Sequence, residues 1–91
     1  MQHSKMRKLI YIPKWMIVLV EIHQARGKRC YCQKLNREVK ISINHLRSIV
    51  KYLEIKQLIE IVASKKIKDL HITEKGKRVA VAALNMKLEL K

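Results

Sequence analysis

Residues 41–60 limit the possible folds of this chain more than any other stretch, because a capped helix pattern there runs directly into a strand pattern. Ser42 is a good N-cap, since its hydroxyl can accept a hydrogen bond from a free backbone N–H of the first turn. The apolar residues recur at three- and four-residue spacing and form one stripe that must face a core, namely Leu46, Ile49, Val50 and Leu53. The opposite side keeps polar and basic side chains, which are Asn44, His45, Arg47, Ser48 and Lys51. Each can hydrogen-bond to bases or phosphates, although an ordinary solvated face has the same composition.

The charge of the chain points to an acidic partner. Lys and Arg number 21 against 7 Asp and Glu in 91 residues, which gives a net charge of +14. Such an excess destabilises a compact monomer by self-repulsion unless something acidic is usually nearby, and nucleic acid is the polyanion that fits best. An anionic membrane is the competing target, but the basic residues are spread through the chain and do not line one face of a single amphipathic helix.

The length is that of a single domain, 1–91, with a basic N-terminal extension over 1–12. A chain this short buries only a modest core, so we expect a second copy to stabilise it. The longest apolar run, from Trp15 to Val20, is far shorter than the roughly 20 residues that span a bilayer. No small-residue cleavage site follows the basic start. We therefore expect a cytoplasmic protein with no membrane partner.

The two cysteines, Cys30 and Cys32, are one residue apart, which is too close for an easy mutual disulfide. A site of two Cys and two His can be drawn with His23 and His45, but its spacing matches no common zinc pattern. We expect both thiols to be buried small hydrophobes, with no metal and no cofactor. An intermolecular disulfide stays open if the source is a hyperthermophilic archaeon or its virus or plasmid, which richness in Lys and Ile would suit.

The rest of the pattern gives the order helix, helix, helix, strand, strand, helix. Three helices are expected first: one that starts at Pro13 and stops at Gly27, a short one over 31–38 and a third over 42–55. Two strands follow, over 58–63 and 67–72, joined by a turn at 64–66. The last element is a helix over 74–90 that Thr73 caps. Gly76 is expected to weaken the first turn of that last helix. The fold class is thus α+β and mainly helical.

The last helix has a wider apolar face than one small domain needs to cover. Its apolar positions Val79, Ala82, Ala83, Met86 and Leu90 recur at helical spacing, and a second stripe lies beside them. We interpret the surplus as a homodimer contact made by Val79, Ala83, Met86 and Leu90.

This order of elements resembles the winged helix-turn-helix. Residues 41–60 look like its recognition helix and first wing strand, and Leu-His-Ile-Thr-Glu-Lys-Gly-Lys at 70–77 is similar to the strand-to-helix junction of MarR-type and PadR-type regulators. The likeness covers 14–90 and implies three helices, a two-stranded wing and a C-terminal helix. It also implies a transcriptional regulator that binds double-stranded DNA as a homodimer.

The resemblance assigns roles to the basic and polar residues. Asn44, His45, Arg47, Ser48 and Lys51 would read bases, and Arg26, Lys28, Arg29, Ser42, Lys65, Lys66 and Lys68 would bind phosphates. The family usually has Gly where this chain has Lys40 and Gln57, because both turns favour positive φ. A non-Gly residue there costs about 1 kcal/mol, so we expect one of these turns to have a different shape. The wing lacks Gly and is short, so it is expected to reach phosphates without entering the minor groove.

Other function classes fit the sequence less well. The acidic residues are scattered singly, no catalytic arrangement of Ser, His and Asp or of Cys and His is suggested, and no Gly-rich phosphate loop exists, so we expect no enzyme. The remaining alternatives are a sequence-independent chromatin or replication protein and a winged-helix module for protein assembly. Salt titration distinguishes them, because a binder that relies on phosphates loses affinity steeply with salt on any duplex.

Overall fold

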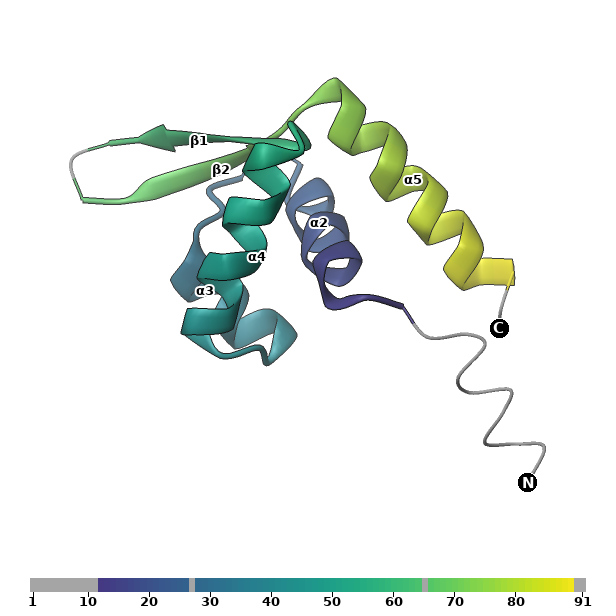
Figure 1. The fold of residues 1–91 in the computed structure, drawn as a ribbon, viewed down its shortest axis with the longest axis horizontal. Coiled ribbons are helices and arrows are strands. Elements are labelled where there is room, and N and C mark those ends of the chain that lie inside the picture. Colours follow the sequence, from purple (N-terminus) through teal and green to yellow (C-terminus); the bar gives the residue numbers. More distant parts are fainter. Residues whose placement is uncertain (1–11, 27, 65, 90–91) are drawn as a thin grey trace.

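The computed structural model describes residues 12–26, 28–64 and 66–89, and the side chains up to residue 86. The elements follow in the order α2 (Lys14–Gln24), α3 (Cys32–Val39), α4 (Ile43–Ile55), β1 (Ile59–Ala63), β2 (Lys68–Ile72) and α5 (Glu74–Glu89). Helices α2, α3 and α4 cluster together, the hairpin of β1 and β2 projects from this cluster, and α5 leads away on the other side (Figure 1). The predicted mainly helical α+β class and the predicted order of elements are confirmed.

Helix α2 supplies one wall of the core. It begins after Pro13, which occupies the N-cap position, and it buries Val18, Leu19 and Ile22. It ends at Gln24, before the predicted stop, because the chain turns at Arg26, whose φ is 51°. No helix in the described part of the chain is long and apolar enough to cross a membrane.

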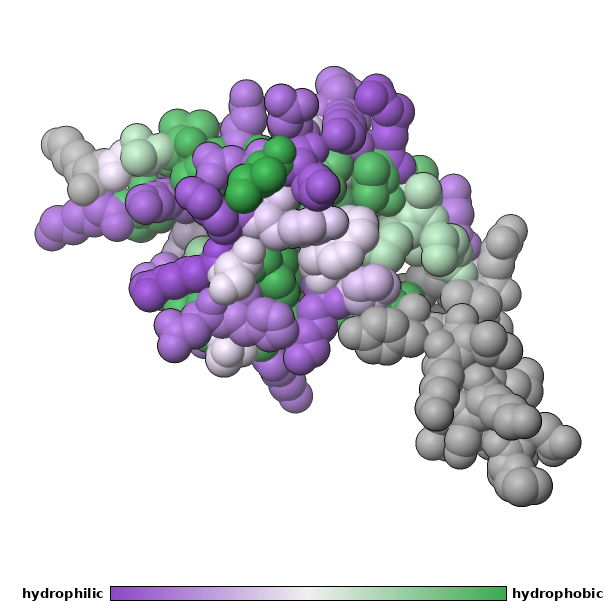
Figure 2. Space-filling view, in the orientation of Figure 1, coloured by the Kyte–Doolittle hydropathy of each residue, from purple (hydrophilic) through white to green (hydrophobic). Residues whose placement is uncertain are grey.

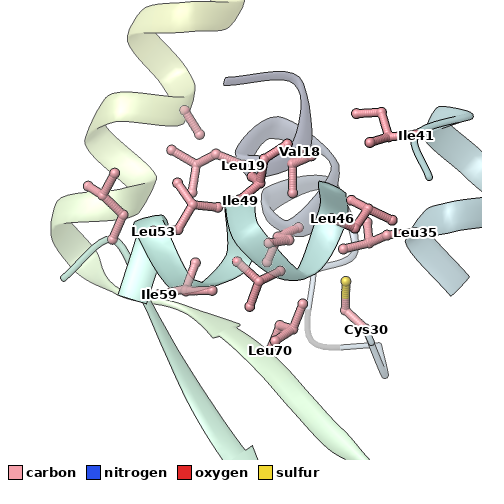
Figure 3. Close-up of a cluster of buried hydrophobic side chains, with 14 residues drawn as sticks. Val18, Leu19, Cys30, Leu35, Ile41, Leu46, Ile49, Leu53, Ile59 and Leu70 are labelled. Atoms are coloured by element: carbon pink, nitrogen blue, oxygen red, sulfur yellow. The ribbon is translucent and has the colours of Figure 1, made fainter. Parts of the chain in front are cut away.

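Helix α4 forms as the pattern predicted. The Ser42 hydroxyl accepts a hydrogen bond from the backbone N–H of His45 at 3.3 Å, and it caps the first turn. The predicted stripe of Leu46, Ile49, Val50 and Leu53 is buried. Figure 3 shows Leu46, Ile49 and Leu53 between α2, α3 and the start of the hairpin, in one cluster with Leu19, Leu35 and Ile59. Because its apolar stripe is covered here, α4 has to present its polar side to solvent.

The hairpin is antiparallel, and its register pairs Ile59 with Ile72 and Ile61 with Leu70. Ile59 and Leu70 are buried, whereas Glu60 and His71, which pair on the other face, are exposed. The two strands therefore alternate between a face toward the core and an exposed face. The backbone N–H of Leu70 also donates to the carbonyl of Cys30 at 2.8 Å, so the segment before α3 crosses beside β2.

The two turns that lack Gly keep the left-handed conformation. Lys40 has a φ of 56° and Gln57 a φ of 62°, so the prediction that one of these turns has a different shape is wrong. Side chains brace both turns: Asn36 Nδ2 donates to the carbonyl of Ile41 at 2.6 Å, and Thr73 Oγ1 donates to the carbonyl of Gln57 at 2.8 Å. The packed domain thus holds two non-Gly residues in a conformation that costs each about 1 kcal/mol.

Gly76 has a packing role that helix propensity does not predict. The predicted cap is confirmed, since Thr73 Oγ1 accepts from the backbone N–H of Gly76 at 3.0 Å. A Cβ at position 76 would overlap the carbonyl oxygen of Leu58 and lie 2.8 Å from Cγ1 of Ile72. Only glycine lets the first turn of α5 lie this close to the connection between α4 and β1.

Helix α5 uses part of its apolar face within the chain. It packs against α2, Ala80 and Ala83 are buried, and Val79 is half-buried against the core. Ala83 is therefore corrected from a dimer contact to a core residue. Met86 remains 49% exposed and Val81 45% exposed, while Leu90 lies outside the described residues. Among the described side chains of α5, Val81 and Met86 therefore supply the large exposed apolar surface.

Candidate nucleic-acid interface

The polar side of α4 is uncovered. Asn44, His45, Arg47, Ser48 and Lys51 are all exposed, on the side of the helix away from its buried stripe. In the view of Figure 2, hydrophilic side chains gather over α3, whereas the hairpin carries both hydrophilic and hydrophobic side chains. The Ser48 hydroxyl donates to the carbonyl of Asn44 at 3.4 Å and keeps its lone pairs open to solvent. The structure thus leaves every predicted base-reading side chain open to a partner.

A groove of about 600 Å³ separates α4 from the wing. Its walls come from the start of α3, one flank of α4 and both strands of the hairpin, and four cationic side chains line it, namely Arg47, Lys51, Lys66 and Lys68. The sequence placed these cations on two separate elements, and the fold brings them to one groove. Lys65, the other predicted wing cation, lies outside the described residues.

The start of α3 adds polar groups that the sequence-based prediction missed. Tyr31 and Gln33 line the same groove. Tyr31 is the N-cap of α3, but its side chain makes no capping hydrogen bond. It therefore does not pair with the backbone N–H groups of the first turn. A helix N-terminus carries partial positive charge, which adds to the charge of the cations. The sequence does show a basic turn that leads into a helix at 29–33. That the start of this helix lies beside α4, however, depends on the tertiary fold.

Arg29, which is a predicted phosphate contact, also makes an ion pair within the chain. Its Nη2 donates to Oδ2 of Asp69 at 2.9 Å, and its Nε donates to Oδ1 at 3.2 Å. This bidentate pair ties the segment before α3 to strand β2, and the hydrogen bond to Asp69 raises the pKa of Arg29. A guanidinium held in this way has its planar fork occupied by a carboxylate.

The other predicted phosphate contacts fall into two groups. Ser42 is exposed at the N-terminus of α4, although its hydroxyl oxygen already accepts the capping hydrogen bond from the backbone N–H of His45. Arg26 and Lys28 are exposed too, but they line a different hollow together with His71 and Lys77, and no residue of α4 takes part in it. The structure therefore does not bring Arg26 and Lys28 together with the polar face of α4.

The two cysteines differ in their surroundings. Both are free thiols, and Cys30 is buried whereas Cys32 is half-buried in the wall of the groove. Desolvation raises the pKa of Cys30 from 9.0 to about 11. Desolvation also raises the pKa of Cys32, while the nearby charges of Arg47 and Lys68 oppose that rise. Within the described part of the chain, no three His, Cys, Asp or Glu residues come together as a metal site would require.

Three clustered helices, an antiparallel hairpin beside the exposed third helix and a further helix define a winged helix-turn-helix fold. The solved structures similar to this chain include a crystal structure of AF1382 from Archaeoglobus fulgidus. It has a TM-score of 0.85 and 21% sequence identity, with 93% of this chain and 96% of that chain covered. No protein-family model matches the sequence, and no curated protein matches it.

A second similar structure is that of a putative MarR family transcriptional regulator from Listeria monocytogenes, complexed with 26mer DNA. Its TM-score is 0.76 and its sequence identity 24%, with 96% of this chain and 59% of that chain covered. This chain therefore spans less than two thirds of the length of the Listeria regulator. The resemblance to MarR-type proteins predicted from the sequence is confirmed at the level of the fold.

Proposed function

We propose that this chain binds double-stranded DNA sequence-specifically and regulates transcription as a homodimer. The observation that carries the proposal is the uncovered polar side of α4 next to a groove lined by four cations, which include Arg47 and Lys68. A major groove about 12 Å wide admits one α-helix, and phosphates of the adjoining backbone would lie against the cations. The DNA complex of the Listeria regulator, which shares this fold, supports the same use.

The exposed side chains of α4 would divide the work by their chemistry. Arg47 would pair bidentately with guanine, and Asn44 with adenine. His45, Ser48 and Lys51 would add single hydrogen bonds to base edges. Lys66 and Lys68 of the wing, with Ser42 at the start of α4, would hold phosphates and fix the register of the helix on the duplex.

The proposed homodimer uses α5. Met86 and Val81 supply its exposed apolar surface, with the half-buried Val79 beside the core. A dimer would present two copies of α4 to half-sites about 34 Å apart, so the site should be nearly palindromic. Sedimentation at tens of micromolar tests this: a dimer is expected, and a strict monomer would contradict it. Met86→Lys should then shift the equilibrium toward monomer without unfolding the chain.

The DNA proposal is tested by selecting preferred duplexes from a random pool at physiological salt. We expect a recurrent motif, bound at least a thousandfold more tightly than random DNA. Arg47→Ala should weaken the specific complex by about 1 to 3 kcal/mol. Arg78→Ala is the matched control, because Arg78 is exposed on α5 and lines neither the groove nor the second hollow. An equal loss on random DNA from Arg47→Ala would refute a base-reading role.

A sequence-independent chromatin or replication protein is the second candidate, and the net charge of +14 favours it. Such a protein would bind every duplex with the same steep dependence on salt, and the selection would return no motif. A winged-helix assembly module would show neither a motif nor salt-dependent DNA binding. The same selection and salt titration therefore distinguish all three classes.

A further inference from the structure

A second basic hollow, of about 450 Å³, lies between the end of α2, strand β2 and the start of α5. The titratable side chains that line it are all nitrogen bases: His23, Arg26, Lys28, His71 and Lys77. Its floor is apolar and includes Ile22 and Ile72. Three long cationic side chains therefore stand around a hollow with apolar residues in its lining.

This hollow is separate from the groove beside α4. The two share a single lining residue, Leu70, which is 5% exposed. The chain crosses beside β2 at the hydrogen bond between Leu70 and Cys30, so Arg26 and Lys28 line the hollow on one side of the crossing and Tyr31 lines the groove on the other. The groove and the hollow therefore lie on different sides of this crossing.

The positive charge of the hollow is not cancelled by acids in its lining. Glu74 is the partner of Lys77, with Oε1 3.6 Å from Nζ, and that exposed contact is weak. Glu60 pairs with His71 across the hairpin but does not line the hollow. Among the described residues, Arg26, Lys28 and Lys77 line the hollow and do not line the groove beside α4.

We infer that this hollow binds the phosphate backbone of a second stretch of duplex DNA, so that one protein molecule holds two DNA segments. The inference rests on the proposed function in that the partner is duplex DNA. Backbone contacts of this kind carry no sequence information, and long cationic side chains suit them. The second stretch is either another duplex or a distant part of the same duplex bent around the protein.

The test uses the whole protein and the variant Arg26→Gln/Lys28→Gln. Glutamine is a suitable replacement at Arg26, whose φ is 51°, because Gln57 of the same chain already adopts a φ of 62°. The control Arg37→Gln/Arg78→Gln removes the same charge from exposed residues that line neither the groove nor the hollow. One arm measures capture of a fluorescent duplex by an immobilised duplex. A second arm measures end-to-end FRET on one long duplex, and a third measures anisotropy on one short duplex.

We expect the native protein to capture the second duplex or to bring the ends of the long duplex together. The Arg26/Lys28 variant should lower that signal at least about fivefold and reduce its salt exponent by about 1.8, which corresponds to two phosphate contacts. The control should change it by less than about twofold, and anisotropy on the short duplex should be nearly unchanged.

Three results would overturn the inference. In the first, the native protein gives neither capture nor end-to-end approach. In the second, the Arg26/Lys28 variant behaves like the control, which would mean that two α4 helices of a dimer do the bridging. In the third, the hollow binds only inorganic phosphate or a nucleotide. By contrast, if Arg47→Ala leaves short-duplex binding unchanged and the Arg26/Lys28 variant abolishes it, the proposal for α4 fails while DNA binding by the hollow stands.

Discussion

Gly76→Ala tests the packing at the start of α5, because two physical effects predict opposite signs. Alanine is better than glycine in a helix by about 1 kcal/mol, so helix propensity alone predicts a more stable protein. In the structure, however, the added Cβ would lie 2.8 Å from Cγ1 of Ile72 and would overlap the carbonyl oxygen of Leu58. The Leu58 carbonyl belongs to the backbone and also accepts from the backbone N–H of Thr73 at 3.1 Å, so it cannot move alone.

Overpacking of this kind costs about 1 to 3 kcal/mol or more. We expect Gly76→Ala to lower the free energy of unfolding by about 3 kcal/mol, a large share of the roughly 5 to 10 kcal/mol that stabilises a domain of this size. The melting temperature should fall by roughly 15 °C. Chemical denaturation followed by circular dichroism measures the change. Asn85→Ala, at an exposed position of the same helix, is the control and should stabilise slightly. A Gly76→Ala protein as stable as the native one would refute the close approach described here.

The remaining predictions concern a turn, the wing and a thiol. Gln57→Gly should raise the free energy of unfolding by about 0.5 kcal/mol in chemical denaturation, since it relieves the positive φ, whereas Gln57→Val should lower it by more than about 1 kcal/mol. Equal effects of the two variants would argue against a left-handed turn. Asp69→Ala should tighten duplex binding severalfold and steepen its salt dependence, because it removes a carboxylate from the wing and frees Arg29. Unchanged affinity in fluorescence anisotropy would mean that the wing lies away from the DNA. Burial raises the pKa of the Cys30 thiol from 9.0 to about 11, so the unfolded chain loses this proton at lower pH, and the free energy of unfolding should fall as pH rises between these values. Cys30→Ala should reduce that slope, with the remainder due to Cys32, and denaturation of both proteins across this range checks it.

The sequence predicted the elements whose signals are local. The cap at Ser42, the buried stripe of α4 and the cap at Thr73 each depend on residues within one or two turns, and each is confirmed. The strand pattern of the hairpin is also local, and Ile59 and Leu70 of its two strands are buried. These features were sufficient to predict a winged helix and the polar face of α4.

What the sequence did not reveal depends on contacts between distant residues. Arg29 and Asp69 are 40 positions apart, and neither carries a local signal that the other will be its partner. From the sequence alone, Gly76 was expected only to weaken the helix. Its packing role could not be predicted, because the carbonyl that it accommodates belongs to the distant residue Leu58. The apolar face of α5 was visible, but whether Ala83 faces α2 or a second subunit depends on how the helices pack.

The most direct test of the account is a map of which backbone amides respond when the labelled protein is titrated with its preferred duplex. Because the exposed side of α4 is the surface proposed to enter the major groove, the largest NMR shift changes should fall at 42–52, with further changes at 31–34 and 66–68. Arg47→Ala should reduce those changes at equal DNA concentration. Amides of α4 that stay unperturbed while the duplex binds elsewhere would contradict the proposed interface.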